Sequence, residues 1–401
     1  MLIHDFEKVI ERRGTECKKY DTYAADVLPL WIADTDFQCP QPVVDAMVAR
    51  ARHGIYGYPI NAANFNRAVA HWQKERFGWD VPEAWVEYTP AVIPAIIYAI
   101  NTFSQPGDQV LIQCPVYPPF HAAITNNGRI IVNNQLQLVD GQYQVDFADL
   151  EAKLAQPRTR LMILCHPHNP VGKAFTREEL LKIGELCARH HVLVVVDEIH
   201  QDIIYKGYKH FPFASLSEVN RDNSITCVNP SKTFNVAGVR TGAVIIPNPA
   251  IRELFYECIV NHKTYGRTIF GTLPLEVCYN QCGYYADQLM AYLQGNLEFL
   301  QDFVAREIPR IKVVRPQATY LIWLDCRDLG LGQAELVKLL LETAKVALND
   351  GASFGPGGTG FMRINIACRR ATLEAALQRI QRAVQGLPPS ERATQPMTLA
   401  R

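Results

Sequence analysis

The sequence has no excess of charge of either sign. Its 401 residues include 40 Lys and Arg and 40 Asp and Glu, so the formal net charge is zero. Binding to nucleic acid or to an anionic membrane usually requires a broadly basic surface, so this composition argues against both partners. A small molecule is therefore the expected partner.

Long apolar runs are also absent from the sequence. No stretch approaches the roughly 20 apolar residues of a membrane-spanning helix, and the first residues, "MLIHDFEKVIERRG", lack the apolar core of a signal peptide. We expect a soluble, cytoplasmic protein.

Paired cysteine spacings are missing although the sequence contains 11 cysteines. An odd number of scattered thiols is typical of a reduced cytosolic protein. Cys278 and Cys282 are spaced to share a helix face, but a structural zinc site needs four ligands. We expect no metal.

Helical segments alternate with short apolar strands, a pattern that predicts an α/β fold with a largely parallel sheet. The predicted strands run into polar or proline-marked turns: "DQVLIQCPVY" (108–117), "RLMILCHPHNP" (160–170), "HVLVVVDEIH" (191–200) and "SITCVNPSK" (224–232). Since ligands of open α/β sheets bind at the carboxyl ends of strands, residues in these turns are candidates for one shared site.

Two further segments complete the predicted pattern. A helix over 176–191 is indicated by Thr176 as its cap and Glu179 three residues later. From about 286 a long helical stretch leads into strands at 311–326, which predicts a second, smaller domain.

Four side chains follow the predicted strands: Tyr117, Asn169, Asp197 and Lys232. A carboxylate at the end of an apolar strand is costly to bury unless a cation pairs with it, and either a structural salt bridge or a protonated pyridine would serve. Lysine offers an amine for covalent bonding, asparagine a donor and tyrosine a ring for stacking. Pyridoxal phosphate requires this set of groups, although a lysine in a polar turn is usually a surface charge.

The ordered motifs of the chain resemble those of fold-type I pyridoxal-phosphate enzymes of the class I/II aminotransferase superfamily, and within it the MalY/PatB-type cystathionine β-lyases. The resemblance covers nearly the whole chain. The motifs are "WIADTDF" (31–37), "IYGY" (55–58), "AVIPAI" (91–96), "QCPVYPPF" (113–120), "HPHNPVG" (166–172), "VDEIHQD" (196–202), "SKTFNVAGVR" (231–240), "ATYLIWLDC" (318–326) and "ALNDGASFGPGGTGFMRINIAC" (347–368).

The resemblance implies a large domain with a mostly parallel seven-stranded sheet and a smaller α+β domain. It implies an N-terminal segment (1–45) that packs with the small domain, a large cofactor-binding domain (46–285), a small domain (286–390) and a flexible tail (391–401).

The resemblance also assigns roles around the cofactor. Lys232 is the lysine that bonds to pyridoxal phosphate and acts in catalysis, Asp197 pairs with the pyridine nitrogen, and Asn169 donates to the phenolic oxygen. Tyr117 stacks on the ring. His200 supports this network, with a histidine satisfied by other protein groups as the alternative.

For the cofactor phosphate, the resemblance implies backbone N–H groups of Val92 and Ile93 at the start of a helix, which is a favourable position for an anion. Ser231 and Arg240 add a hydroxyl and a guanidinium.

Four residues are implied around the substrate and a second subunit. Arg363 clamps the substrate carboxylate, and Ala33 contacts the same carboxylate. Tyr58 reaches the phosphate of the neighbouring subunit of a homodimer with shared sites, with a core aromatic as the alternative. Arg267 reaches an acidic distal group of the substrate, with an ordinary surface arginine as the alternative.

The activity implied is α,β-elimination of L-cystathionine or a related cysteine S-conjugate. An aminotransferase, or another elimination or replacement enzyme, would use the same residues, and a non-catalytic regulatory relative is a further alternative. "VDEIH" and "FMRIN" favour the lyase, and an aminotransferase more often has tyrosine at the position of His200. Glycine-rich "GASFGPGGTG" (351–360) lacks the ending of a phosphate loop, so we expect a mobile or tight loop leading to Arg363.

Overall fold

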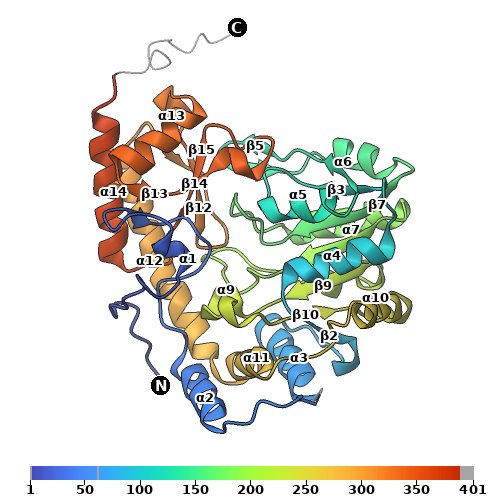
Figure 1. Cartoon of the computed structure of the whole chain (residues 1–401). Helices are drawn as coiled ribbons and strands as arrows, with labels where there is room; N and C mark the ends of the chain where they lie inside the picture. The colour runs from blue at the N-terminus through green and yellow to red at the C-terminus, as the bar shows by residue number, and fades with distance from the viewer. Residues whose placement is uncertain (1, 61–62, 389–401) are drawn as a thin grey trace.

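The computed structural model describes residues 2–60 and 63–388, and its largest sheet has seven strands (Figure 1). The strands lie in the order β2 (Val86–Thr89), β10 (Gly242–Ile245), β9 (Ser224–Val228), β8 (Leu193–Asp197), β7 (Thr159–Cys165), β3 (Gln109–Ile112) and β4 (Ile130–Asn133). β10 is antiparallel to both of its neighbours, and the remaining neighbours pair in parallel. The predicted α/β class with a mostly parallel seven-stranded sheet is confirmed.

Both faces of this sheet are buried, which explains why its central strands are continuous apolar runs. Ile163 and Val195 pack on one face against α4 (Val92–Phe103), α5 (Pro118–Thr125) and α10 (Pro249–Asn261). Met162 and Val194 point to the opposite face, where α6 (Phe147–Leu154) and α7 (Arg177–Arg189) pack. Two separate cores therefore hold the sheet between two layers of helices.

The start of α7 matches the sequence prediction. The Thr176 hydroxyl accepts a hydrogen bond from the Glu179 backbone N–H, and the Glu179 carboxylate accepts one from the Thr176 N–H. This reciprocal capping satisfies two backbone donors that the first helical turn leaves without partners.

A second, antiparallel sheet lies in the C-terminal part of the chain. Its strand order is β11 (Lys312–Val313), β12 (Leu321–Asp325), β15 (Phe361–Asn365) and β14 (Asn349–Asp350). The helices of this part are α12 (Gly283–Glu307), α13 (Gln333–Lys338) and α14 (Arg370–Gln385). The domain boundary between 285 and 286 remains a prediction, and the predicted tail at 391–401 lies outside the described residues.

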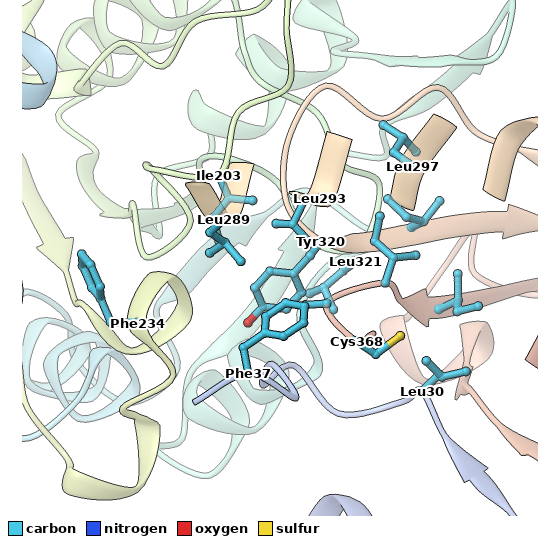
Figure 2. Packing of buried hydrophobic residues seen from close by; sticks show 14 of the residues in the cluster. Leu30, Phe37, Ile203, Phe234, Leu289, Leu293, Leu297, Tyr320, Leu321 and Cys368 are labelled. Carbon is cyan, nitrogen blue, oxygen red and sulfur yellow. The ribbon is translucent and has the colours of Figure 1, made fainter. Parts of the chain in front are cut away.

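The N-terminal segment contributes to the largest hydrophobic cluster. Figure 2 shows Leu30 and Phe37 beside side chains of the C-terminal part such as Tyr320 and Leu321. The short strand β1 (Leu28–Pro29) pairs in parallel with β13 (Val346–Ala347). Segments far apart in sequence are thereby joined next to β12 and β15.

The remaining α-helices and strands belong to both parts of the chain. They are α1 (Lys18–Asp21), α2 (Gln41–Arg52), α3 (Ala63–Phe77), α8 (Glu218–Asp222), α9 (Ser231–Phe234), α11 (Ile269–Gln281), β5 (Gln137–Val139) and β6 (Gln142–Gln144). Among the described residues, no helix combines the length and apolar character needed to cross a membrane.

The glycine-rich loop before β15 is tight because backbone segments touch within it. A Cβ at Gly351 would lie 2.2 Å from the Phe361 carbonyl oxygen and 2.3 Å from the Gly358 carbonyl oxygen. These distances are below any van der Waals contact, and both neighbours are backbone atoms that cannot rotate away. The glycines thus allow two backbone segments of the loop to approach each other closely. The loop leads directly into β15, the strand that carries Arg363.

Gly351→Ala should lower the free energy of unfolding by about 2–3 kcal/mol, because overpacking against backbone forces the strand to shift. Urea denaturation measures this change. Gly295→Ala is the matched control: its new Cβ would lie 3.3 Å from the flexible end of Arg370 in the middle of α12, so it should not destabilise the chain. Equal stability of the two variants would contradict the role assigned to the close approach.

Candidate active site

The polar residues that follow the parallel strands meet in one cavity of about 160 Å³ at the carboxyl edge of the sheet. Asp197 ends β8, Tyr117 caps α5 after β3, and Lys232 lies on α9 after β9. The lining residues are Ala33, Ala91, Val92, Ile93, Tyr117, Cys165, Asn169, Asp197, Ile199, His200, Asn229, Ser231, Lys232, Ala237, Arg240 and Thr241. Most of the side chains expected from the sequence are therefore brought together.

The amine of Lys232 points at the segment that crosses the cavity. Its Nζ donates a 2.6 Å hydrogen bond to the backbone oxygen of Ala33. Burial and the nearby Arg363 lower the pKa of Lys232 from 10.5 to about 8, against the opposing effect of Asp34 and Asp197. About a tenth of this lysine is consequently neutral at pH 7, far more than of an ordinary lysine, and this neutral form can act as a nucleophile or general base.

Asp197 is a buried carboxylate with few partners. Its side chain accepts a 3.1 Å hydrogen bond from the Ile199 backbone N–H, and no lysine, arginine or histidine within residues 2–60 and 63–388 forms an ion pair with it. Burial raises the pKa of Asp197 from 3.8 to about 7. The structural salt bridge considered from the sequence is absent in this region, and a cationic group in the cavity would stabilise the ionised form.

Arg363 connects the cavity to the N-terminal segment. Its guanidinium is 3% exposed and donates to Asn169 Oδ1 at 2.8 Å, to the Trp31 carbonyl at 2.9 Å and to Asn349 Oδ1. Burial lowers the pKa of Arg363 to about 10, so the group stays cationic at neutral pH. Because Asn169 Oδ1 accepts from Arg363, the amide nitrogen of Asn169 is left as the donor.

His200 lies in the cavity wall and is almost fully buried. Its ring meets the Tyr320 ring edge-on at 6.0 Å, and burial lowers the pKa of His200 well below its usual value. Its Nδ1 has no hydrogen-bond partner among the described residues. This neutral histidine has a ring nitrogen without a hydrogen bond to the described residues. It therefore differs from the alternative of a histidine whose hydrogen bonds are all made with other protein groups.

The amino end of α4 forms one side of the cavity. Ala91 precedes the helix without a side-chain cap, so the N–H groups of Val92 and Ile93 are open donors, and Pro94 has no N–H. Ser231 and Arg240 line the same cavity. A helix amino end with a hydroxyl and a guanidinium beside it is a suitable site for a phosphate.

Two residues expected at the site lie elsewhere in the single chain. Tyr58 is fully exposed, which makes the core-aromatic alternative wrong. Arg267 is half-buried, donates to Asn66 Oδ1 at 2.8 Å and lies 4.6 Å over the Phe65 ring. Both line surface hollows away from the cavity.

Several residues of the site were not singled out in the sequence. The Tyr320 hydroxyl donates to the same Ala33 oxygen as Lys232, at 3.2 Å, and Thr241 and Cys165 line the cavity. The available signal for Tyr320 was its position in the apolar segment "ATYLIW", since a buried tyrosine hydroxyl normally needs a partner. Nothing in the sequence indicated that its partner would be residue 33.

The residues in the cavity fit the group expected from the sequence. An amine with a lowered pKa, a buried carboxylate with no ion pair to the described residues, an amide donor, an aromatic ring and an anion site face one space. Pyridoxal phosphate presents an aldehyde, a pyridine nitrogen, a phenolic oxygen, a ring and a phosphate. Each of its polar groups has a complementary group in the cavity.

Comparisons with known proteins agree with this geometry. The family described as "Aminotransferase class I and II" matches residues 25–380. The chain is 43% identical to cystathionine beta-lyase PatB of Bacillus subtilis over 95% of this chain and 100% of that protein.

Solved structures give the same result. Cystalysin from Treponema denticola, which contains pyridoxal 5'-phosphate, superposes with a TM-score of 0.93 at 33% identity, covering 96% of this chain and 99% of that chain. A PLP-bound putative aminotransferase from Clostridium difficile also has a TM-score of 0.93, at 37% identity over 95% of this chain and 100% of that chain. The family expected from the motifs is confirmed: the chain belongs to the class I and II aminotransferase family.

Proposed function

We propose that the chain is a pyridoxal-phosphate-dependent carbon–sulfur β-lyase that converts L-cystathionine or a related cysteine S-conjugate to pyruvate, ammonia and a thiol. The observation that carries the proposal is the placement of the Lys232 amine, Asp197 and the Arg363-bound Asn169 around one cavity. Full-length similarity to cystathionine beta-lyase PatB supports the substrate class.

The cofactor, when bound, supplies an electron sink for the charge that develops at the substrate Cα. Arg363 holds the substrate α-carboxylate by paired hydrogen bonds. The neutral Lys232 amine takes the Cα proton onto Nζ. With the cofactor bound, Asp197 would hold a proton on the pyridine nitrogen, and Asn169 would donate its N–H to the phenolic oxygen.

Lys232 Nζ holds the proton taken from Cα while the leaving sulfur departs with the electron pair of the Cβ–S bond. The sulfur becomes a thiol by taking up a proton from Lys232 or from solvent, and water converts the remaining three-carbon enamine to pyruvate and ammonia. An aminotransferase would instead return a proton from this nitrogen to the cofactor, so the two reactions share residues and differ in proton delivery.

The first test is incubation of the pure protein with L-cystathionine and no 2-oxo acid. We expect pyruvate and thiol in equal amounts over many turnovers, whereas an aminotransferase would stop after one turnover until a 2-oxo acid is added. Lys232→Ala should abolish turnover and the visible absorbance of the lysine-bound cofactor, while Lys206→Ala on the surface should retain both. Failure to form pyruvate would overturn the proposed lyase.

Incorporation of pyridoxal phosphate into the cofactor-free chain should accelerate with pH. The pKa of Lys232 is lowered to about 8, so the neutral amine that attacks the aldehyde increases through this value. The rate should rise about tenfold between about pH 7 and pH 9 and then level off. Stopped-flow absorbance gives the profile.

Asp197→Asn should move the midpoint of that profile to lower pH, because Asp197 is one of the charges that raise the pKa of Lys232. Asp45→Asn, on the exposed side of α2, serves as control and should leave the midpoint in place. A midpoint near that of ordinary lysine, or an upward shift in Asp197→Asn, would contradict the assigned electrostatics.

We also propose a homodimer in which Tyr58 reaches the phosphate in the partner's cavity. Its support is the exposure of Tyr58 and of its apolar neighbours Ile55 and Ile60, which are 68% and 82% exposed. Apolar surface of this kind is usually covered by a partner. Arg267, near the same surface, is proposed to contact the distal end of the substrate.

Mixed dimers test the shared site. Tyr58→Ala and Lys232→Ala chains should each be inactive, but after joint dissociation and reassociation half of the dimers contain one intact site. Activity should recover to about a quarter of the wild-type value, as random pairing predicts. Hybrid dimers without activity, or a fully active Tyr58→Ala homodimer, would count against shared sites.

A cytoplasmic location is proposed as well. All 11 cysteines lie within the described residues and are free thiols, a state typical of reducing compartments.

A further inference from the structure

Residues 31–37 have no regular secondary structure and reach the cavity at Ala33, and side chains from distant parts of the chain hold their backbone oxygens. Arg363 donates to Trp31 O, Asn365 to Ile32 O and Asp34 O, Lys232 and Tyr320 to Ala33 O, and Asn235 to Thr35 O and Phe37 O. One backbone hydrogen bond, from the Asp36 N–H to the Ala367 oxygen at 2.8 Å, adds to these contacts. The segment is therefore placed mainly by side chains and not by a sheet ladder.

A cluster of four charged residues fixes the same segment from the side facing the N-terminus. Lys19 Nζ lies 2.9 Å from Asp36 Oδ1 and 3.5 Å from Asp34 Oδ1. Arg12 lies 2.8 Å from Asp36 Oδ1 and 2.9 Å from Asp34 Oδ2. We call Arg12, Lys19, Asp34 and Asp36 the N-terminal charge cluster.

Backbone contacts of the two cations tighten this arrangement. Arg12 also donates to the Thr35 carbonyl at 3.0 Å, and Lys19 Nζ donates to the Asp34 carbonyl at 3.2 Å. In return, the Trp31 indole N–H donates to the Lys19 carbonyl at 3.1 Å. The cations thus contact both the carboxylates and the backbone of the crossing segment.

Burial makes the cluster sensitive to the loss of any member. The Lys19 side chain is 0% exposed, and burial lowers its pKa, but Asp36 and Asp34 outweigh this effect so that the pKa is raised. Removing one partner of a buried ion pair leaves an uncompensated charge, which is strongly destabilising at that place. Two cations balance two carboxylates in this cluster.

The N-terminal charge cluster is adjacent in sequence to Ala33, whose oxygen accepts the hydrogen bond from the Lys232 amine. Asp34 directly follows Ala33, whose oxygen accepts from Lys232, and Trp31, whose oxygen accepts from Arg363, is three residues away. Displacements of about 1 Å at a reacting site can reduce rates about a hundredfold. A shift of the segment would be transmitted to both contacts.

We infer that Arg12 and Lys19 are positioning residues, which hold segment 31–37 in the place where it orients Arg363 for the substrate carboxylate and presents Ala33 to Lys232. They act through the segment and do not touch substrate. The inference rests on the proposed function for the roles of Arg363 and Lys232.

The first experiment compares Lys19→Met and Arg12→Met with Lys18→Met, an exposed position on the same short helix as Lys19. Hydrogen–deuterium exchange of the cofactor-free chains is followed by mass spectrometry. We expect exchange in segment 31–37 to accelerate at least about fivefold in the first two variants and to stay unchanged in the third. Exchange in α7 and the seven-stranded sheet should match the wild type, which separates local loosening from general unfolding.

The second experiment measures kinetics of the holoenzyme on L-cystathionine. We expect KM to rise about tenfold in Lys19→Met and Arg12→Met while kcat falls less than about threefold, since the Arg363 clamp loses its orientation. Arg12→Lys, which keeps the charge with fewer donors, should restore part of the loss.

Particular results would overturn the inference. Unchanged exchange in 31–37, or a fall in kcat with KM unchanged, would show that the cluster does not position the clamp. Faster exchange throughout the chain in both variants would show a purely structural role. If cystathionine is not cleaved at all, the proposed function fails, and the exchange experiment still decides whether the cluster holds the segment.

Discussion

The cost of burying Asp197, which has no ion-pair partner in the part of the chain that the structure describes, is the constraint on which the rest of the cavity depends. The carboxylate ends a strand that is buried along its whole length, and burial raises its pKa to about 7. A cation in the cavity would recover that cost. The amine, the amide and the anion site around it then specify which cation: a pyridinium that carries an aldehyde, a phenolic oxygen and a phosphate.

Much of this arrangement could be predicted from the sequence because it follows from local rules. Apolar runs gave the strands β3, β7, β8 and β9, and the capping pattern at Thr176 gave the start of α7. The carboxyl ends of parallel strands meet at one edge, so Asn169, Asp197 and Lys232 could be expected to converge.

The remainder depends on contacts between distant residues, which no local pattern encodes. The hydrogen bond from Tyr320 to Ala33 joins residues 287 positions apart, and the contacts of Lys19 with Asp34 and Asp36 span 15 and 17 positions, beyond any helical or strand periodicity. Likewise, Tyr58 has no environment in a single chain from which its role can be read. The sequence motifs indicate which residues are candidates for the site, but only the folded structure shows which groups these residues contact.

The reversed direction of β10 has a consequence for how the cavity is built. Thr89 at the end of β2 pairs with Gly242 at the start of β10, and Val228 at the end of β9 pairs with Ala243. The connection between β9 and β10, residues 229–241, therefore leaves the sheet and returns to it at the same edge. It does not cross over either face of the sheet. Lys232, which we propose bonds to the cofactor, and Arg240 both lie in this connection, and α4 begins shortly after β2 beside the point where the chain returns. The antiparallel strand thus brings Lys232, Arg240 and the amino end of α4 to one corner of the sheet, where they line the same cavity.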